Sequence, residues 1–308
     1  MTNTSTQSVP SVEPDVSPSP ETIADSAADR PPTRGWRAVR RSFRPKTTAF
    51  WGMHVVAVVG AIAYFSWWGV ALAIVSYFVR MVLVTAAYHR YFSHRSFKTS
   101  RVFQFLLALG AQSSAQKGVV WWASHHRHHH KYSDEPQDIH SVRQGGLWNS
   151  HVGWILVPDW DHTNTALVTD LTKFRELRIL NHSAVSLLPA VALAVAFALI
   201  GGVPALMWGF FVSTVMLWHG SFSINSLSHL FGKRRYETSD DSRNNWFLAV
   251  LTTGEGWHNN HHHYQSSANQ GFHWWQIDVT FYVLRLLEMC GLVWDVRRPP
   301  AAVVAGTN

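Results

Sequence analysis

The sequence predicts an all-α membrane protein in which four transmembrane helices form two hairpins beneath a cytoplasmic helical cap. Two observations lead to this prediction: two long stretches without a charged residue, and 19 histidines, several at helical spacing. Hydrophobic residues make up 47% of the 308 residues and charged residues only 15%, too few for an ordinary soluble surface. We expect a histidine-bound site for two metal ions in the cap.

The N-terminal segment, residues 1–33, is rich in Ser, Thr, Pro and Ala, and we expect it to be a disordered tail. It has no basic residue before Arg30, which excludes a signal peptide. An integral-membrane domain is predicted over residues 34–302, followed by a short tail at 303–308.

The charge-free stretches are Thr47–Val79 and Ile179–Gly232. A membrane-spanning helix needs about 20 apolar residues, so the second stretch can hold two helices, as can the first when it is extended to residue 89. Ser-Trp-Trp-Gly at 66–69 and Gly-Gly-Val-Pro at 201–204 divide them with turn-forming residues. The predicted spans are therefore 47–66, 69–89, 183–200 and 204–226, with polar segments at 90–182 and 227–302.

Basic residues flank these spans on one side only. Arg40, Arg41 and Arg44 precede the first span, and Lys233 to Arg235 follow the fourth, whereas both outer turns are uncharged. The positive-inside rule then places both termini and both polar segments in the cytoplasm. Because much of the net charge of +7 lies beside the spans, it indicates membrane topology rather than nucleic-acid binding. Residues 103–114 are apolar but too short to span, which favours an interfacial helix.

The histidines follow four patterns, all on the predicted cytoplasmic side. His89 and His94 form HxxxxH, residues 126–130 and 258–262 each form HxxHH, and His229 ends Asn-Ser-Leu-Ser-His. Spacing of i, i+3 and i+4 puts imidazoles on one helical face. The second box is overfilled, because His125, His128 and His129 also satisfy HxxHH. The candidate ligands, enough for two metal ions, are His89, His94, His126, His129, His130, His229, His258, His261 and His262.

The other histidines are expected to be surface, hydrogen-bonded or ligand-supporting residues, with His54 and His219 inside the bundle. The single cysteine, Cys290, excludes internal disulfides, Cys-based zinc sites and a built-in iron–sulfur cluster.

These motifs resemble the membrane fatty acid desaturases of the stearoyl-CoA desaturase type, over about residues 88–296. The resemblance rests on Tyr88 to Lys98, His151-Val-Gly-Trp, Asn225 to Gly232 and Gly254-Glu-Gly-Trp-His-Asn-Asn-His-His. It implies a bacterial cytoplasmic-membrane enzyme with two Fe²⁺ ions and O₂ as co-substrate. One iron would bind His89, His94, His126, His130 and His262; the other would bind His129, His229, His258 and His261, with Asn225 acting through a water. Arg127 and Lys131-Tyr-Ser match the family flanks only when His126 begins the second box.

The chemistry agrees with this resemblance. A methylene group has no acidic proton, so its C–H cleavage needs an oxidant made from O₂ at a metal. Removal of two hydrogens would leave a cis double bond, delta-9 by family default. Since no haem or flavin motif is found, the electrons would come from a separate protein of ferredoxin or cytochrome b5 type with an NAD(P)H reductase. Candidate carboxylates that would accept a hydrogen bond from the ligand imidazoles and fix their tautomers are Asp134, Asp138, Asp240, Asp241 and Glu255.

For the substrate, acyl-CoA is favoured over acyl-lipid. Tyr77 would close the tunnel for its methyl end, with Ala73 one turn beyond. A related hydroxylase or alkane monooxygenase, and a His-rich metal transporter, are the alternative functions. Candidate cations for the substrate headgroup are Arg143, Arg175, Arg178, Lys233, Arg234 and Arg235.

Overall fold

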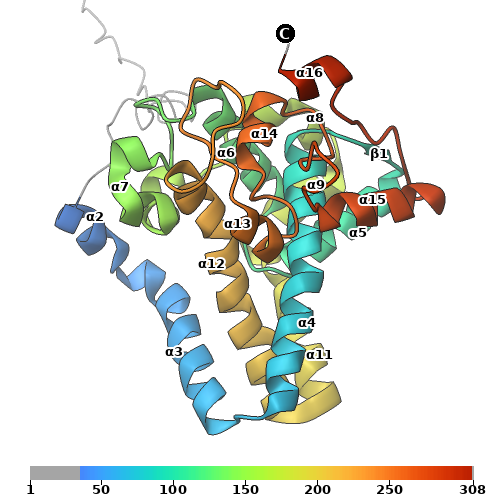
Figure 1. Cartoon of the computed structure of the whole chain (residues 1–308). Coiled ribbons are helices and arrows are strands. Elements are labelled where there is room, and N and C mark those ends of the chain that lie inside the picture. Colours follow the sequence, from blue (N-terminus) through green and yellow to red (C-terminus); the bar gives the residue numbers. More distant parts are fainter. Residues whose placement is uncertain (1–34, 307–308) are drawn as a thin grey trace, which may run out of the picture.

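The computed structural model describes residues 35–306, and these are mostly helical (Figure 1). The predicted N-terminal tail, 1–33, lies outside the described residues. The predicted C-terminal tail begins inside helix α16 (Ala301–Ala305), whose Val304 carbonyl accepts a hydrogen bond from Tyr236.

Long apolar helices project from one side of the molecule (Figure 1). Within residues 35–306, three stretches are long and apolar enough to cross a membrane: Pro45–Ala63, Trp67–Ser93 and Ser183–His229. The first contains α3 (Thr48–Ala63), and the second contains α4 (Trp67–Leu83) and the π-helix η2 (Val84–Ser93). The third contains α10 (Ser183–Ser186), α11 (Leu188–Ala205), the π-helix η6 (Leu206–Val212), α12 (Ser213–Ser226) and η7 (Leu227–His229).

Helical geometry is interrupted at or next to both predicted turns. Between α3 and α4 the chain turns at Tyr64–Ser66, and the Ser66 hydroxyl caps α4 by accepting from the Gly69 amide at 3.0 Å. Within the third stretch, Gly201 and Gly202 leave helical geometry, and Gly202 adopts a φ of +65°, which a glycine tolerates at little cost. Beyond this kink η6 packs against α11.

Arg80 is a buried charge within the second stretch. Its guanidinium donates to the Thr214 hydroxyl at 2.7 Å and the Ser213 hydroxyl at 2.5 Å, and also to the carbonyls of Ser76 and Ser113. Acceptors on α4 itself, on α12 and just after α5 (Arg101–Gln112) therefore satisfy the one basic residue of α4.

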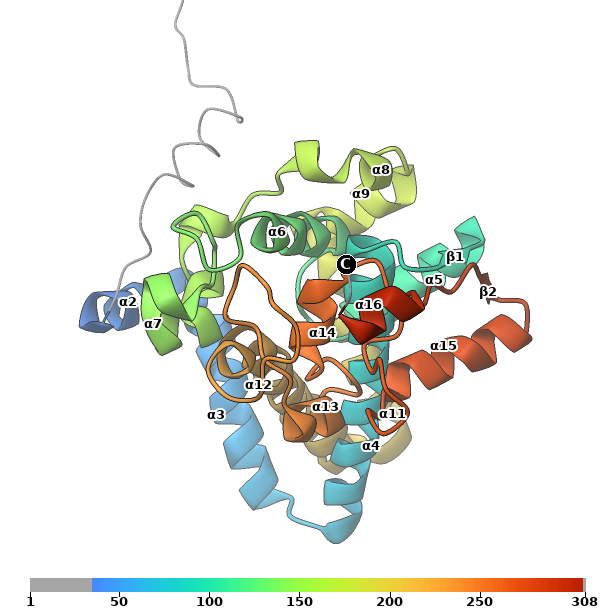
Figure 2. The ribbon, with the colours of Figure 1, turned by 45° about the horizontal axis from the view of Figure 1, so that its top comes forward.

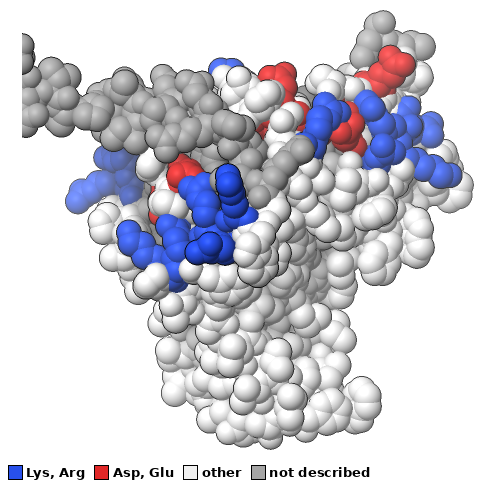
Figure 3. Space-filling model, turned by 90° about the vertical axis from the view of Figure 1, so that its left-hand side faces the viewer, with Lys and Arg blue, Asp and Glu red and all other residues white. Residues whose placement is uncertain are grey.

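The cap lies at the other end of the molecule, where charged residues gather. On the face shown in Figure 3, Lys, Arg, Asp and Glu lie on the cap, and the projecting part of the molecule shows none. The cap elements are α2 (Gly35–Ser42), α5 (Arg101–Gln112), α6 (Val119–Tyr132), α7 (Val142–His151), α8 (Thr169–Thr172), α9 (Arg175–Asn181), α13 (Trp246–Leu251), α14 (His258–His263), α15 (Val279–Met289) and α16. Short 3₁₀ turns are η1 (Pro45–Thr47), η3 (Gly153–Leu156), η4 (Pro158–Trp160) and η5 (Thr165–Val168). The expected interfacial helix at 103–114 corresponds to α5.

One antiparallel pair of two-residue strands, β1 (Lys98–Thr99) and β2 (Val293–Trp294), ties the cap's C-terminal segment to the end of the second long helix. Figure 2 shows α6 and α14 near the centre of the cap, above α12. These two helices carry the HxxHH motifs.

Candidate metal centre

Nine histidines gather in the cap in two groups. In each group, one ring nitrogen from every residue lies within 4.8 Å of those of the others. The five-histidine cluster consists of His89, His94, His126, His130 and His261. The four-histidine cluster consists of His129, His229, His258 and His262.

Helices α6 and α14 each contribute histidines to both clusters, and the i and i+4 residues of each motif join one cluster while the i+3 residue joins the other. On α6, His126 and His130 join one cluster and His129 the other, and on α14, His258 and His262 separate from His261 in the same way. Residues i and i+4 lie about 40° apart around a helix, whereas i+3 falls on the other side of i. The resemblance implied that His262 binds the same ion as His89 and that His261 binds the same ion as His129. This assignment is wrong, because His261 lies in the five-histidine cluster and His262 in the four-histidine cluster.

In the structure the second HxxHH motif consists of His126, His129 and His130, which all lie in the clusters. His125 lies outside both clusters, where it stacks on Trp121 with ring centroids 4.2 Å apart, and its Nδ1 bonds the Trp121 carbonyl. His128 bonds the Gln137 carbonyl instead. Arg127 fixes the rotation of α6, because it donates to the carbonyls of Phe92 and Ser93 and to the Asp170 carboxylate.

The first box lies on the π-helix η2. His89 sits within it and His94 follows its end. The wider turn is closed by the Ser93 hydroxyl, which donates to the Tyr88 carbonyl at 2.8 Å. π-Helical turns shift side chains relative to an α-helix and often occur at functional sites. Here the turn lets His89 reach His261, with their Nε2 atoms 3.0 Å apart.

Two glycines explain the Gly-Glu-Gly run before the third box. A Cβ on Gly256 would lie 2.0 Å from the Ala249 amide nitrogen, and one on Gly254 would lie 2.3 Å from an Asp278 carboxylate oxygen. Gly254 also has a φ of +129°. The close approach of this turn to α13 and α15 aims Glu255 at His89 and Arg90.

The two asparagines of the third box hold α14 in place. Asn259 and Asn260 are fully buried. The Asn259 side chain accepts from the amides of Arg235 and Tyr236, and Asn260 donates to the carbonyl of Gln270. A six-residue helix is too short to be stable alone, so these hydrogen bonds position its three histidines.

Four ligand candidates have a carboxylate at Nδ1. His129 bonds Asp138 and His229 bonds Asp134, each at 2.9 Å, and His262 bonds Asp240. In the five-histidine cluster, His89 pairs with Glu255. A carboxylate at Nδ1 fixes the tautomer, so that the Nε2 lone pair faces the cluster. Of the five expected acceptors, Asp241 is the wrong one: its side chain pairs with Arg143.

Burial keeps most of these imidazoles neutral. The pKa of His262 falls to about 4, because burial lowers it by more than the Asp240 carboxylate raises it. His129 is the exception: although burial lowers its pKa, the carboxylates of Asp138 and Asp134 raise it above the ordinary value. Burial, reinforced by neighbouring histidines, lowers the pKa well below the usual range for His94, His126, His130, His258 and His261.

The clusters fit metal ions. Nε2 atoms of neighbouring histidines lie 2.9 Å apart for His94 and His126 and 3.1 Å apart for His229 and His258. Two nitrogens at right angles on a metal, each about 2.1 Å away, would be separated by about 3.0 Å. The Nε2 atoms of His129 and His262 are buried with no hydrogen-bond partner among the described residues. Buried lone pairs of this kind need a ligand, and imidazole suits iron and other first-row metals.

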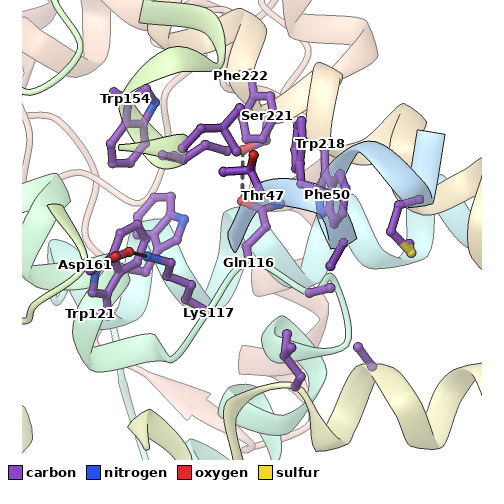
Figure 4. A pocket seen from close by; sticks show the side chains of 18 of the residues that line it. Thr47, Phe50, Gln116, Lys117, Trp121, Trp154, Asp161, Trp218, Ser221 and Phe222 are labelled. Carbon is purple, nitrogen blue, oxygen red and sulfur yellow. Dashed lines mark hydrogen bonds and ion pairs between the residues drawn. The ribbon is translucent and has the colours of Figure 1, made fainter. Parts of the chain in front are cut away.

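Two cavities adjoin the clusters. A small chamber of about 40 Å³ touches ligands of both clusters, among them His89 and His258, and is also lined by Met81, Thr85 and Asn225. A larger cavity of about 670 Å³ shares Trp122, His126, Ser221 and Asn225 with the chamber. It extends between α3, α11 and α12 and is mainly apolar; Figure 4 shows Phe50, Trp218 and Phe222 in its wall.

Comparison with known proteins identifies the family. The fatty acid desaturase family model matches residues 65–292. The chain belongs to this family. It is 34% identical to the sn-1 stearoyl-lipid 9-desaturase of Synechocystis, over 87% of the chain and 86% of the relative. It is 40% identical to an acyl-CoA 5-desaturase of Anemone leveillei (80% and 77%) and 37% identical to the palmitoyl-monogalactosyldiacylglycerol delta-7 desaturase of Arabidopsis thaliana (81% and 67%).

None of the expected substrate residues is among the lining residues of these two cavities. Tyr77 and Ala73 line neither of the two cavities; the Tyr77 hydroxyl donates to the Leu251 carbonyl at 2.9 Å. The headgroup candidates, Arg143, Arg175, Arg178 and Lys233 to Arg235, also line neither.

Sequence reasoning missed Arg90 and Gln270. Arg90 is buried and joins Glu255 to Asp278, both at 3.0 Å, and Gln270 lies 3.2 Å from His89 Nδ1. Arg90 could have been recognised as a supporting residue from the sequence, because it directly follows the ligand candidate His89 in a segment that is otherwise poor in charge.

Proposed function

We propose that this chain is an O₂-dependent fatty acyl desaturase that binds two iron ions in its histidine clusters and inserts a cis double bond into a saturated acyl chain. The observation that supports this most is the junction of the two clusters with the apolar cavity through Trp122, His126 and Asn225. In the balanced reaction, –CH₂–CH₂– and O₂ take up two electrons and two protons and yield –CH=CH– and two waters.

When bound, the irons would supply the oxidising power that cleavage of an unactivated C–H bond needs. The protein's residues then have three tasks. The carboxylates of Glu255, Asp134, Asp138 and Asp240 hold four imidazoles with their Nε2 atoms toward the metals. Trp122, stacked on His126 at a centroid distance of 4.8 Å, walls the reacting end of the cavity against water. Asn225, in the chamber beside His129 and His258, would hold a water at the four-histidine cluster.

For the position of the double bond we propose delta-9. The Synechocystis relative is a 9-desaturase, but the Anemone leveillei and Arabidopsis thaliana relatives act at delta-5 and delta-7, so the family alone does not fix the position.

We propose four membrane spans, because the kink at Gly201–Gly202 divides the third apolar stretch, which at 47 residues would otherwise be about 70 Å long. Both termini and the clusters would face the cytoplasm, in keeping with the basic residues beside the spans. Two electrons per turnover would come from a separate protein of ferredoxin or cytochrome b5 type with its NAD(P)H reductase.

At the methyl end, Tyr77 remains a proposed boundary. Met81 lines the chamber, and Tyr77 lies one helical turn behind it; a Cβ on Gly220 would touch both side chains. Tyr77→Ala should shift preference toward longer chains, whereas Tyr77→Phe, which keeps the ring, and Ala73→Phe should change it little. An unaltered chain-length profile in Tyr77→Ala would exclude this role.

The proposed function is tested by expressing the chain in a host with a defined fatty acid pool and mapping double bonds in its lipids. We expect products 2 mass units lighter than the saturated chain, formed by the wild type and not by His258→Ala. Products 16 units heavier would identify a hydroxylase instead, and an unchanged fatty acid pool would contradict both enzymes.

A further inference from the structure

The large cavity is open toward the side of the molecule. Several residues that line it are also exposed on the outside, namely Ala49 on α3 and Leu187, Val191 and Val195 on α11. Val191 and Val195 are about half exposed. These residues belong to the stretches Pro45–Ala63 and Ser183–His229, which would lie in the bilayer. Because the exposed wall is apolar, the opening faces lipid tails rather than water.

The polar end of the cavity is basic but carries few charges. Its charged lining residues are Arg44, Lys46, Lys117 and Asp161. Lys117 is neutralised by Asp161 at 3.0 Å, an ion pair drawn in Figure 4. Lys46 is exposed. The Arg44 guanidinium donates from Nη2 to the Leu156 carbonyl, while its Nε is buried with no partner among the described residues. These two cations, which have no carboxylate partner in the part of the chain that the structure describes, match one phosphodiester, whereas coenzyme A would bring three phosphate groups to the same place.

Hydrogen-bond donors inside the cavity also lack acceptors. The Gln116 Nε2 and the Trp154 Nε1 are buried and unpaired within the part of the chain that the structure describes. Gln116 is held in place by the Ser221 hydroxyl, 3.4 Å from its Oε1, as Figure 4 shows. A buried donor needs an acceptor, and the ester carbonyls of a glycerolipid are acceptors at the boundary between headgroup and tail.

Helix α2 marks the level of the membrane surface beside this end. Trp36 and Phe43 are 74% and 57% exposed, and Arg37 and Arg40 are exposed on the same short segment. Exposed aromatic and basic residues together are typical of a helix at the lipid headgroups. Since Arg44 and Lys46 follow α2 directly, the polar end of the cavity lies at headgroup depth.

We propose that the substrate is an acyl chain of an intact membrane glycerophospholipid, which enters sideways from the bilayer between α3 and α11. The phosphodiester pairs with Arg44 and Lys46, the ester region meets Gln116 and Trp154, and the tail continues past His126 into the chamber. This inference rests on the proposed function, and it replaces acyl-CoA, which the sequence favours, as the substrate class.

Photo-crosslinking tests the proposal without requiring turnover. The full chain is reconstituted into phosphatidylcholine vesicles with a trace of phosphatidylglycerol that carries a diazirine in its sn-1 stearoyl chain. A stearoyl-CoA with the same diazirine is the competing probe. We expect the phospholipid to label residues of the cavity wall, and unlabelled stearoyl-CoA in excess not to displace it.

Ala194 lines the cavity on α11, whereas Ala192 on the same helix does not. Ala194→Phe should lower phospholipid labelling about tenfold by filling the opening, and Ala192→Phe should leave it unchanged. Lys46→Glu should weaken labelling by the anionic lipid, and Lys173→Glu, outside the cavity, should not. Size-exclusion profiles and circular dichroism check that each variant is folded.

Labelling of the cavity by stearoyl-CoA alone, or equal effects of the two alanine variants, would overturn the inference. Its failure can be told from failure of the proposed function. Double bonds formed in cells without phospholipid labelling of the cavity reject only the lipid substrate. Labelling without double bonds rejects only the desaturase activity.

Discussion

The two histidine clusters differ in how their ligands are supported. Three of the four imidazoles in the four-histidine cluster bond a carboxylate, from Asp134, Asp138 or Asp240. In the five-histidine cluster, among the residues that the structure describes, only His89 does so, through Glu255. A carboxylate at Nδ1 makes the imidazole a stronger donor, and nearby negative charge stabilises a cation. The cluster with fewer nitrogens thus has more electron-donating support.

The difference suggests that the two metal positions are unequal. The five-histidine cluster can fill five positions around an ion with nitrogen alone. The four-histidine cluster leaves room for another ligand on the side of the chamber, where Asn225 lies with His129 and His258. Loss of one imidazole should therefore weaken metal binding more in the four-histidine cluster than in the five-histidine cluster.

The largest effect is expected for His258→Ala. Only three imidazoles would remain in its cluster, so the iron content should fall from about two ions to about one per chain. Desaturase activity should fall at least about 100-fold. Iron is measured by mass spectrometry on the purified protein, and activity from double bonds in host lipids. Two irons retained in an inactive protein would contradict the assignment of His258 as a ligand.

The matching change in the other cluster is His126→Ala. Four imidazoles would remain there, so iron loss should be smaller than for His258→Ala, with activity still reduced at least about tenfold. His125→Ala is the control, because His125 faces Trp121 and not a cluster. A damaging His125→Ala beside a fully active His126→Ala would reverse the register of the second box.

Removal of carboxylate support should have a smaller effect. Asp134→Asn takes the acceptor from His229 Nδ1, and we expect metal affinity to fall about 10- to 100-fold. Asp241→Asn is the matched control, since this neighbouring side chain pairs with Arg143 at the surface. Affinity is measured by competition with a chelator of known strength. Equal losses in the two variants would show that the Asp134 carboxylate gives His229 no specific support, which would remove this part of the difference between the clusters.

The smallest effect concerns pH. Because the pKa of His129 is raised above the ordinary value, protons compete with a metal more strongly at this residue, and the competition grows as pH falls. The pKa values of His94 and His126 are lowered, so these residues stay neutral. Between pH 7.5 and 6, Co²⁺ affinity of metal-free protein should fall by up to about tenfold per unit at the four-histidine cluster and little at the other. Identical slopes in His129→Ala and wild type would contradict this.

Much of the site follows from local sequence, because helical spacing and charge-free length are local properties. The nine candidate ligands, the turn before Trp67 and the kink at Gly201–Gly202 are of this kind. The division of His261 and His262 follows from spacing only in part. The i, i+4 spacing groups His262 with His258, but which cluster each side chain joins depends on how α14 is set against α6. That setting depends on long-range hydrogen bonds of Asn259 and Asn260.

The supporting residues were harder to predict for the same reason. Four of five candidate carboxylates contact a ligand, but Asp241 could be separated from Asp240 only by the fold. The large cavity depends on helices distant in sequence, and the expectation for the substrate headgroup therefore fell on Arg143, Arg175 and Arg178, which lie outside it.

The separation of the clusters' residues along the chain has a consequence for biosynthesis. His89 and His261 meet in one cluster although 172 residues separate them. At about 5 to 20 residues per second, a ribosome needs on the order of 10 to 35 seconds to make the intervening chain. During that time the five-histidine cluster lacks His261, and the four-histidine cluster lacks His258 and His262. If the clusters bind metal as proposed, the full set of ligands becomes available only after residue 262 has been made. The buried Arg90, which joins Glu255 and Asp278, can hold this late segment against η2 without a metal ion.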